Sequence, residues 1–132
     1  GSLGRKFLLV SDLMHTGEEI PTISGDVSLR QAILRMSQKK FGALVITGHD
    51  QSLDGIFTDG DLRRYFERSN GSLDVPLSTI MGRNPKRIAP QRLAAEALKI
   101  METSSITSLA VAEGDRLVGF LHLHDILRAR LV

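Results

Sequence analysis

Two segments of the chain place a polar side chain three residues before an aspartate, where a strand pattern changes into a helix pattern. In the stretch GIFTDGDLRRYF, residues 55–66, these residues are Thr58 and Asp61. The same order of residue types recurs 64 positions later, from Asp61 to Asp125, in GFLHLHDILRAR, where His122 takes the place of the threonine. Polar side chains at such a junction can bind a ligand or stabilise the junction itself.

Both uses follow from the chemistry of these side chains. The carboxylate of Asp61 can accept hydrogen bonds from two neighbouring hydroxyls of a bound molecule, and we expect the Thr58 hydroxyl to lie on the same side. Asp is also a favoured residue at a helix start, where it stabilises the helix by about 1 kcal/mol. Because the spacing recurs in a matched segment, we favour ligand binding over capping alone, and one Asp can do both.

The chain as a whole is an internal repeat. The segments SDLMHTG and LRQAILRM of the first half match STIMGRN and AAEALKIM of the second half. Each half predicts the order strand, helix, strand, strand, helix, which is an α/β unit. A unit of roughly 60 residues can hardly bury a stable core alone, so we expect the two repeats to pack together.

Hydrophobic periodicity locates the predicted elements. In the first long helix of each repeat, apolar residues recur at i, i+3, i+4 and i+7. Ser28 with Gln31 is typical of a capping box at the first of these helices, and the second repeat has no counterpart. The predicted strands are 22–23, 43–47 and 53–57 in the first repeat and 87–88, 109–112 and 117–121 in the second, and the closing helices are 61–68 and 124–131.

Composition excludes several classes of function. The 132 residues carry a net charge of only +2 and 5% aromatic residues, so neither a basic nucleic-acid surface nor a base-stacking platform is expected. The chain has no Cys, which removes disulfides, zinc-thiolate sites and thiol catalysis and fits a reducing compartment. No apolar run approaches the roughly 20 residues that cross a bilayer, so we expect a cytoplasmic protein without a membrane partner.

The chain resembles a tandem of CBS domains, the module named after cystathionine beta-synthase. The ribose motif of that family is Gly, two apolar residues, Thr or Ser, two variable residues and Asp, and residues 55–61 match it in full. The second repeat departs from the motif, because His122 stands where a hydroxyl is usual. The resemblance implies CBS repeats at 10–69 and 77–132, joined by a linker at 70–76 and related by an approximate two-fold axis.

A narrower resemblance covers nearly the whole chain. LGRKFLLVSDLMH, GIFTDGDLRRYF and LHLHDILRA are similar to the C-terminal half of D-arabinose 5-phosphate isomerases, the enzymes of Kdo, lipopolysaccharide and capsule synthesis. In that family an N-terminal sugar isomerase (SIS) domain carries the catalytic residues, so residues 1–9 would be the remnant of the linker from a missing SIS domain. The chain shows no carboxylate pair, nucleophile triad or phosphate-binding glycine loop, and we expect no catalysis from it alone.

The resemblance implies a regulatory module for a nucleotide or nucleotide sugar. AMP, ATP and CMP-Kdo, the activated sugar of the pathway, are the candidate ligands, and no cofactor is required. The ligand-binding residues would be Thr58, Asp61, His122, Asp125, Thr22, Ile23, Arg87 and Ile88, with Thr107 and Ser108 where family members touch base or phosphate. Thr107 and Ser108 could equally be hydrogen bonders at a strand edge.

The histidines give little support for a metal site. His122 and His124 alternate along a predicted strand end, so we expect them to point to opposite faces and only His122 to line the ligand cleft. His15 and His49 are interpreted as linker and turn residues. With no Cys in the chain, we predict no metal site.

An interaction module is the alternative function. The closing helices keep apolar residues on faces that one small unit cannot fully cover, which predicts a homodimer. These residues are Leu62, Phe66, Ile126, Leu127 and Leu131. In this alternative the repeats dimerise and brace the isomerase, and no physiological ligand binds.

Overall fold

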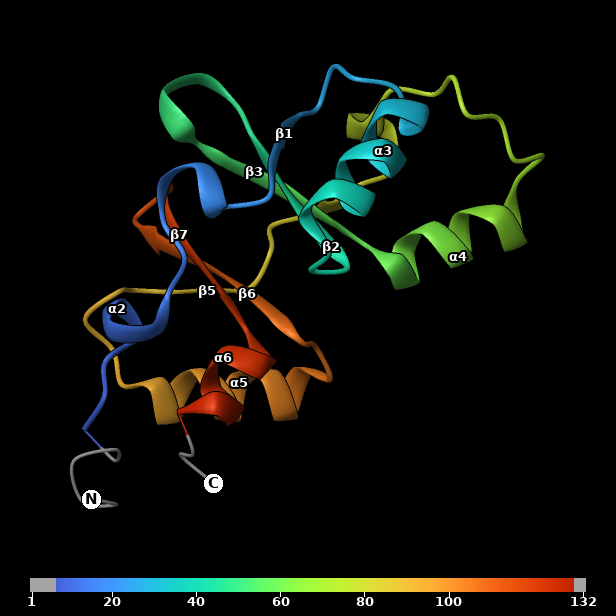
Figure 1. The fold of residues 1–132 in the computed structure, drawn as a ribbon. Coiled ribbons are helices and arrows are strands. Elements are labelled where there is room, and N and C mark those ends of the chain that lie inside the picture. Colours follow the sequence, from blue (N-terminus) through green and yellow to red (C-terminus); the bar gives the residue numbers. More distant parts are fainter. Residues whose placement is uncertain (1–6, 130–132) are drawn as a thin grey trace. The chain divides into compact units, whose positions relative to one another are not determined.

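The computed structural model describes residues 7–129, which form two compact units (Figure 1). The continuous unit is Pro21–Pro85. The discontinuous unit joins the N-terminal segment, up to Ile20, with the chain from Lys86 onward. Every helix within residues 7–129 is too short or too polar to cross a membrane.

The continuous unit contains a four-stranded sheet in the order β1-β2-β3-β4. Strand β1 runs parallel to β2, and the pairs β2-β3 and β3-β4 are antiparallel. Leu29, Ala32, Met36, Leu44, Ile46, Phe57 and Leu77 form its core. Its elements are β1 (Thr22–Ser24), α3 (Leu29–Lys39), β2 (Ala43–Thr47), η2 (His49–Gln51), β3 (Leu53–Thr58), α4 (Asp59–Arg68), η3 (Leu77–Thr79) and β4 (Gly82–Arg83).

The discontinuous unit contains a three-stranded sheet in the order β5-β6-β7, with β5 parallel and β7 antiparallel to β6. Figure 1 shows α5 and α6 side by side next to this sheet, and α2 packs against α5 and β7. The core is Val10, Ile88, Ala97, Leu98, Met101, Leu109, Val111, Leu121 and Ile126. The elements are α2 (Val10–Leu13), η1 (Gly17–Glu19), β5 (Arg87–Ile88), α5 (Ala94–Ser104), β6 (Ser108–Glu113), β7 (Arg116–His122) and α6 (Leu123–Arg128).

The predicted α/β order of strand, helix, strand, strand, helix is confirmed in both repeats, as β1-α3-β2-β3-α4 and β5-α5-β6-β7-α6. The predicted capping box of α3 is also present: the Ser28 hydroxyl accepts from the Gln31 amide at 3.3 Å, and the Gln31 side chain accepts from the Ser28 amide at 3.2 Å. Helix α4 begins at Asp59, two residues earlier than predicted, because Thr58 is its N-cap. The predicted end of the last helix, 130–131, lies outside the described residues.

The first residues of each repeat, 10–20 and 77–85, are its leading segment. Each leading segment belongs to the compact unit that contains the remaining residues of the other repeat. Val10 is fully buried in the core of the discontinuous unit, and Leu77 is fully buried in the core of the continuous unit. Leu9 forms a bridge with Leu93, and the Ala94 amide donates to the Leu8 carbonyl at 2.8 Å. The compact units therefore cut across the repeats 10–69 and 77–132 that the sequence defines, and the remainder of the predicted linker remnant, residues 1–6, lies outside the described residues.

One of the apolar residues predicted to be uncovered on the closing helices is buried, and another, Leu131, lies outside the described residues. Ile126 is fully buried, because it packs into the core between α6 and the β5-β6-β7 sheet, and so it is not an uncovered apolar residue. Phe66 and Leu127 are exposed, at 46% and 44% of their surfaces.

Candidate functional site

In the continuous unit, Thr58 and Asp61 form a reciprocal capping box at the junction of β3 and α4. The Thr58 hydroxyl accepts from the Asp61 amide at 3.1 Å, and Oδ2 of Asp61 accepts from the Thr58 amide at 2.9 Å. Oδ1 of Asp61 accepts from the Arg64 guanidinium at 2.7 Å. The capping function is therefore present, and 24% of the Asp61 side-chain surface stays exposed.

An open groove of about 310 Å³ leads to this carboxylate. Asp61, Arg64, Tyr65, Arg68, Ser69 and Ile80 line the groove. The first four residues follow one face of α4, at i, i+3, i+4 and i+7. The Tyr65 hydroxyl donates to the Ser72 carbonyl at 2.7 Å, which holds that wall in place. Within residues 7–129, Arg68 makes neither a hydrogen bond nor an ion pair with another side chain, so its guanidinium can receive an anionic group.

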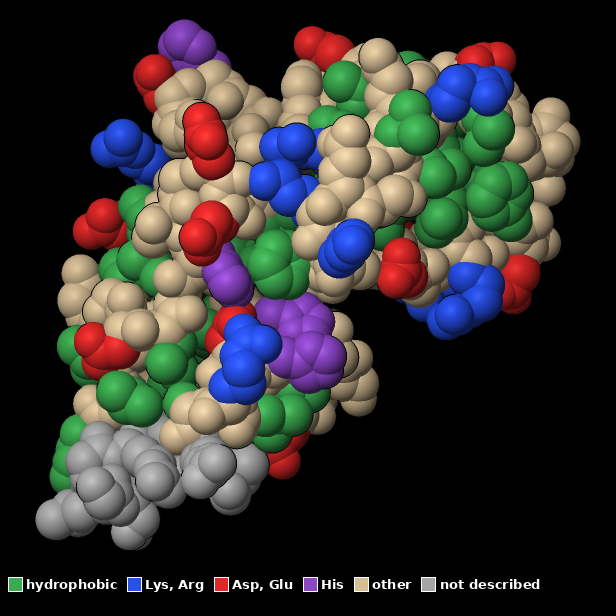
Figure 2. Space-filling model, in the orientation of Figure 1, with side chains coloured by type: hydrophobic (Ala, Val, Ile, Leu, Met, Phe, Trp, Pro, Cys, Tyr) green, Lys and Arg blue, Asp and Glu red, His purple; other side chains and the backbone are tan. Residues whose placement is uncertain are grey.

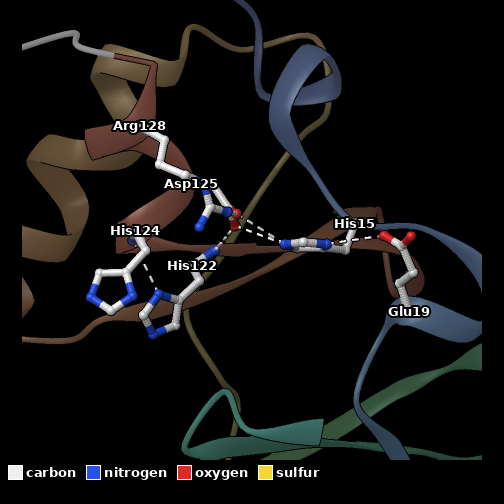
Figure 3. A network of polar contacts seen from close by, with 6 residues as sticks. All are labelled: His15, Glu19, His122, His124, Asp125 and Arg128. Atoms are coloured by element: carbon white, nitrogen blue, oxygen red, sulfur yellow. Dashed lines mark hydrogen bonds and ion pairs between the residues drawn. The ribbon is translucent and has the colours of Figure 1, made fainter.

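Asp125 is the equivalent of Asp61 in the discontinuous unit, and it is surrounded by His15, His122 and Arg128 (Figure 3). Oδ2 of Asp125 accepts from the His122 amide at 2.8 Å, and Oδ1 accepts from the Arg128 guanidinium at 2.6 Å. Nε2 of His15 lies 3.0 Å from both carboxylate oxygens. As a result, only 6% of the Asp125 side chain is exposed, compared with 24% for Asp61.

His15 reaches Asp125 because its backbone is fixed beside β7. The His15 amide donates to the Phe120 carbonyl at 2.8 Å, and the Phe120 amide donates to the His15 carbonyl at 3.0 Å. The second ring nitrogen, Nδ1, lies 3.0 Å from Oε1 of Glu19. The His15 ring therefore lies between two carboxylates, those of Asp125 and Glu19.

The prediction that His122 and His124 point to opposite faces is wrong. Strand β7 ends at His122, which is the N-cap of α6, so the alternation of a strand does not continue to His124. Nδ1 of His122 accepts from the His124 amide at 3.0 Å, and the two ring centroids are 4.6 Å apart. Figure 2 shows histidine side chains adjoining one another at the surface.

The environment of His122 favours its neutral form. Burial lowers the pKa of the His122 imidazole below its usual value, the nearby His124 lowers it further, and the Asp125 carboxylate opposes these effects. The hydrogen bond to Nδ1 agrees with this direction, because an accepting nitrogen carries no proton. Among residues 7–129, no group of three or more His, Asp or Glu side chains is arranged to hold a metal ion.

Four other predicted ligand-binding residues lie on the short strands β1 and β5. Thr22 and Ile23 pair with β2, and Arg87 and Ile88 pair with β6. The Arg87 guanidinium donates to the Gly114 carbonyl at 3.3 Å, so it is held at the β6-β7 turn.

Thr107 and Ser108 differ from each other in burial. Thr107 is exposed, and its carbonyl accepts from the Leu123 amide at 2.8 Å. Ser108 is the register partner of His122, it is buried, and its hydroxyl has no hydrogen-bond partner among the described residues. Ligand contact by Thr107, Ser108 or the residues of β1 and β5 stays a prediction.

Comparison with known proteins decides the family. The sequence pattern of the CBS domain matches residues 10–68 and again 77–132. The chain belongs to the CBS domain family. The predicted tandem of CBS repeats is thereby confirmed.

Relatives and solved structures agree with this assignment. Arabinose 5-phosphate isomerase KdsD from Yersinia pestis is 49% identical over all of this chain, which spans 40% of the length of that relative. A CBS-domain-containing protein from Agrobacterium tumefaciens has a TM-score of 0.82 at 28% identity, with 94% of each chain covered. CBSX2, solved in complex with AMP, has a TM-score of 0.79 at 19% identity, with 94% of this chain and 96% of that chain covered.

Sequence reasoning missed three residues that contact the two CBS aspartates. Arg64 and Arg128 each stand three residues after an aspartate, and this shared spacing could have identified them. His15 was interpreted as a linker residue, and the interpretation is wrong, because His15 contacts Asp125. Its signal is weaker: it follows Met14 where Gly82 follows Met81 in the matching segment.

Proposed function

We propose that this CBS pair is the regulatory module of a D-arabinose 5-phosphate isomerase and binds a nucleotide or nucleotide sugar at Thr58 and Asp61. The observation that carries the proposal is the partly exposed Asp61 carboxylate beside a groove that two arginines line. The identity to KdsD over the whole chain supports an isomerase as the parent protein. Catalysis would belong to an SIS domain, and this module would report ligand binding to it.

The groove offers contacts for both parts of a nucleotide. A ribose has two neighbouring hydroxyls that can donate to the Asp61 carboxylate, and the guanidinium groups of Arg64 and Arg68 complement a phosphate or a sugar carboxylate. AMP and ATP are the first ligands to test, since CBSX2 carries AMP in the same fold. CMP-Kdo meets the same requirements, because it has a ribose, a phosphate and a carboxylate.

Titration calorimetry and thermal unfolding with AMP, ATP and CMP-Kdo test this proposal. A ligand that binds only the folded state at a hundredfold excess over Kd stabilises it by about 2.7 kcal/mol. Asp61→Asn keeps an oxygen for the capping box but removes the carboxylate, and we expect at least a tenfold loss of affinity. Asp115→Asn is the matched control, because Asp115 is 98% exposed on the β6-β7 turn and does not line the groove. Equal affinities in the parent and Asp61→Asn would refute the proposed site.

The second candidate is a dimerisation module without a physiological ligand. The exposed Phe66 and Leu127 on the closing helices favour self-association. Light scattering at micromolar concentration, on the parent and on Phe66→Ser with Leu127→Ser, measures this association. A dimer in the parent and a monomer in the variant, with no stabilisation by any nucleotide, would favour this function over ligand regulation.

A further inference from the structure

The two CBS aspartates share two hydrogen-bond contacts. Each accepts from the amide of the residue three positions before it, and each accepts from the arginine three positions after it. Among residues 7–129, Asp125 alone has a third partner, the ring of His15 at 3.0 Å from both oxygens. The side chain of Asp125, which has this partner, is 6% exposed, and that of Asp61 is 24% exposed.

The residue equivalent to His15 in the continuous unit is Gly82. His15 bridges Phe120 in β7, and Gly82 pairs with Ile56 at the corresponding place in β3. In both units a methionine precedes this residue and packs against the glycine of the ribose motif. The two backbones therefore occupy matching positions, and Gly82 has no side chain that could reach Asp61.

We propose that His15 fills the second ligand position of the module, so that each chain binds one nucleotide, at Asp61, and none at Asp125. This inference rests on the proposed function and deepens it by assigning the residue that sets the number of ligands. His15 is then a specificity-determining residue that excludes a ligand by occupying the acceptor the ligand would need.

The contacts at Asp125 favour His15 over a ribose. The His15 ring lies 3.0 Å from both Asp125 oxygens, so it occupies the acceptors that the ribose hydroxyls would need. Glu19 holds the other ring nitrogen, and a ligand would have to separate this contact network before reaching Asp125. Arg128 does not explain the difference, because Arg64 makes the same contact to Asp61.

His122 is the other difference between the two positions, and it requires its own test. It replaces Thr58, but its backbone amide donates to Asp125 as the Thr58 amide donates to Asp61. Its Nδ1 is already used by the His124 amide. We therefore expect the substitution His122→Thr alone to leave Asp125 closed, because His15 still covers the carboxylate.

Native mass spectrometry and titration calorimetry with AMP on the 132-residue chain measure the number of sites. The parent should bind one AMP per chain, and His15→Gly, which copies the residue at position 82, should bind two. Adding Asp125→Asn to His15→Gly should remove the second site. His15→Ala is a second variant for the same test, because the bridge to Phe120 uses only backbone atoms and should keep the segment in place. The reciprocal Gly82→His should weaken binding at Asp61 at least tenfold.

Three results would overturn the inference: two AMP molecules on the parent, no added site in either His15 variant, or a second site opened by His122→Thr alone. Failure of the proposed function would give a different result, because that function is tested by comparing the nucleotide affinities of the parent and of Asp61→Asn. If the parent bound no AMP but His15→Gly bound one that Asp125→Asn removed, the site at Asp61 would be refuted and the role of His15 supported.

Discussion

The thioether of Met14 lies directly against the α-carbon of Gly119, so that a β-carbon at residue 119 would stand 2.5 Å from the Met14 Sδ. The same relationship joins Met81 to Gly55, where the distance would be 2.6 Å. The first glycine of the ribose motif thus has a packing role in both units. It lets the leading segment of one repeat approach the strand that carries the motif of the other.

Substitution of these glycines should destabilise the fold. Gly119→Ala and Gly55→Ala force the methionine or the strand to move, and overpacking of this kind costs about 1 to 3 kcal/mol. Gly82→Ala is the control, since its nearest contact would be an ordinary 3.4 Å, and it should change stability by less than about 0.5 kcal/mol. Urea unfolding measures all three. Full stability in Gly119→Ala would contradict the packing role, and recovery in Gly119→Ala with Met14→Ala would support it.

Substitutions of Thr58 should distinguish its role in capping α4 from its role in ligand binding. Thr58→Ala removes the hydroxyl that accepts from the Asp61 amide, and loss of such a cap costs about 1 kcal/mol of stability. Thr58→Ser keeps the hydroxyl and should stay within a few tenths of a kcal/mol of the parent, by the same ranking of caps. The midpoint of thermal unfolding without ligand measures the capping role alone. An unchanged midpoint in Thr58→Ala would show that the capping box contributes little to the fold.

Local patterns predicted the elements of this protein better than they predicted its contacts. The strand Ala43–Thr47 and the capping box at Ser28 depend on neighbouring residues, and both are confirmed. The contact of His15 with Asp125 joins residues 110 positions apart, so no local signal could predict it. The leading segments are short, four residues in α2, and carry no periodicity that shows which unit they join.

His122 makes the stability of the fold depend on pH. Its pKa is lowered in the folded state by burial, so below its usual pKa of about 6.5 the unfolded chain binds more protons than the folded chain. The contribution of His122 is therefore fully present above about pH 7 and decreases as the pH falls through the lowered pKa. The midpoint of thermal unfolding should fall between pH 7.5 and pH 5, and less steeply in His122→Asn, which keeps an N-cap that does not titrate.

The difference between the two proteins isolates His122 from the other histidines, which both retain. A nitrogen-detected NMR titration of the imidazole provides an independent check. It should show the proton of the neutral ring on Nε2, because Nδ1 accepts from the His124 amide. Parallel pH profiles for the parent and His122→Asn would disprove this contribution.

The assignment of residues to the two units predicts which strands a core substitution destabilises. Leu77 is fully buried among residues of α3, β2 and β3, so Leu77→Ala should cost about 2 to 5 kcal/mol through lost burial and the cavity that remains. Val10 is fully buried among residues of α5, β6 and β7, and Val10→Ala removes two methyl groups, a loss of at least about 1.5 kcal/mol.

Native-state hydrogen exchange should show that the two substitutions reduce the protection of different strands. Val10→Ala should weaken the amides of β6 and β7 although Val10 begins the first repeat, and Leu77→Ala should weaken those of β2 and β3 although Leu77 begins the second. If each substitution instead affected mainly the strands of its own repeat, the exchange of leading segments between the units would be wrong.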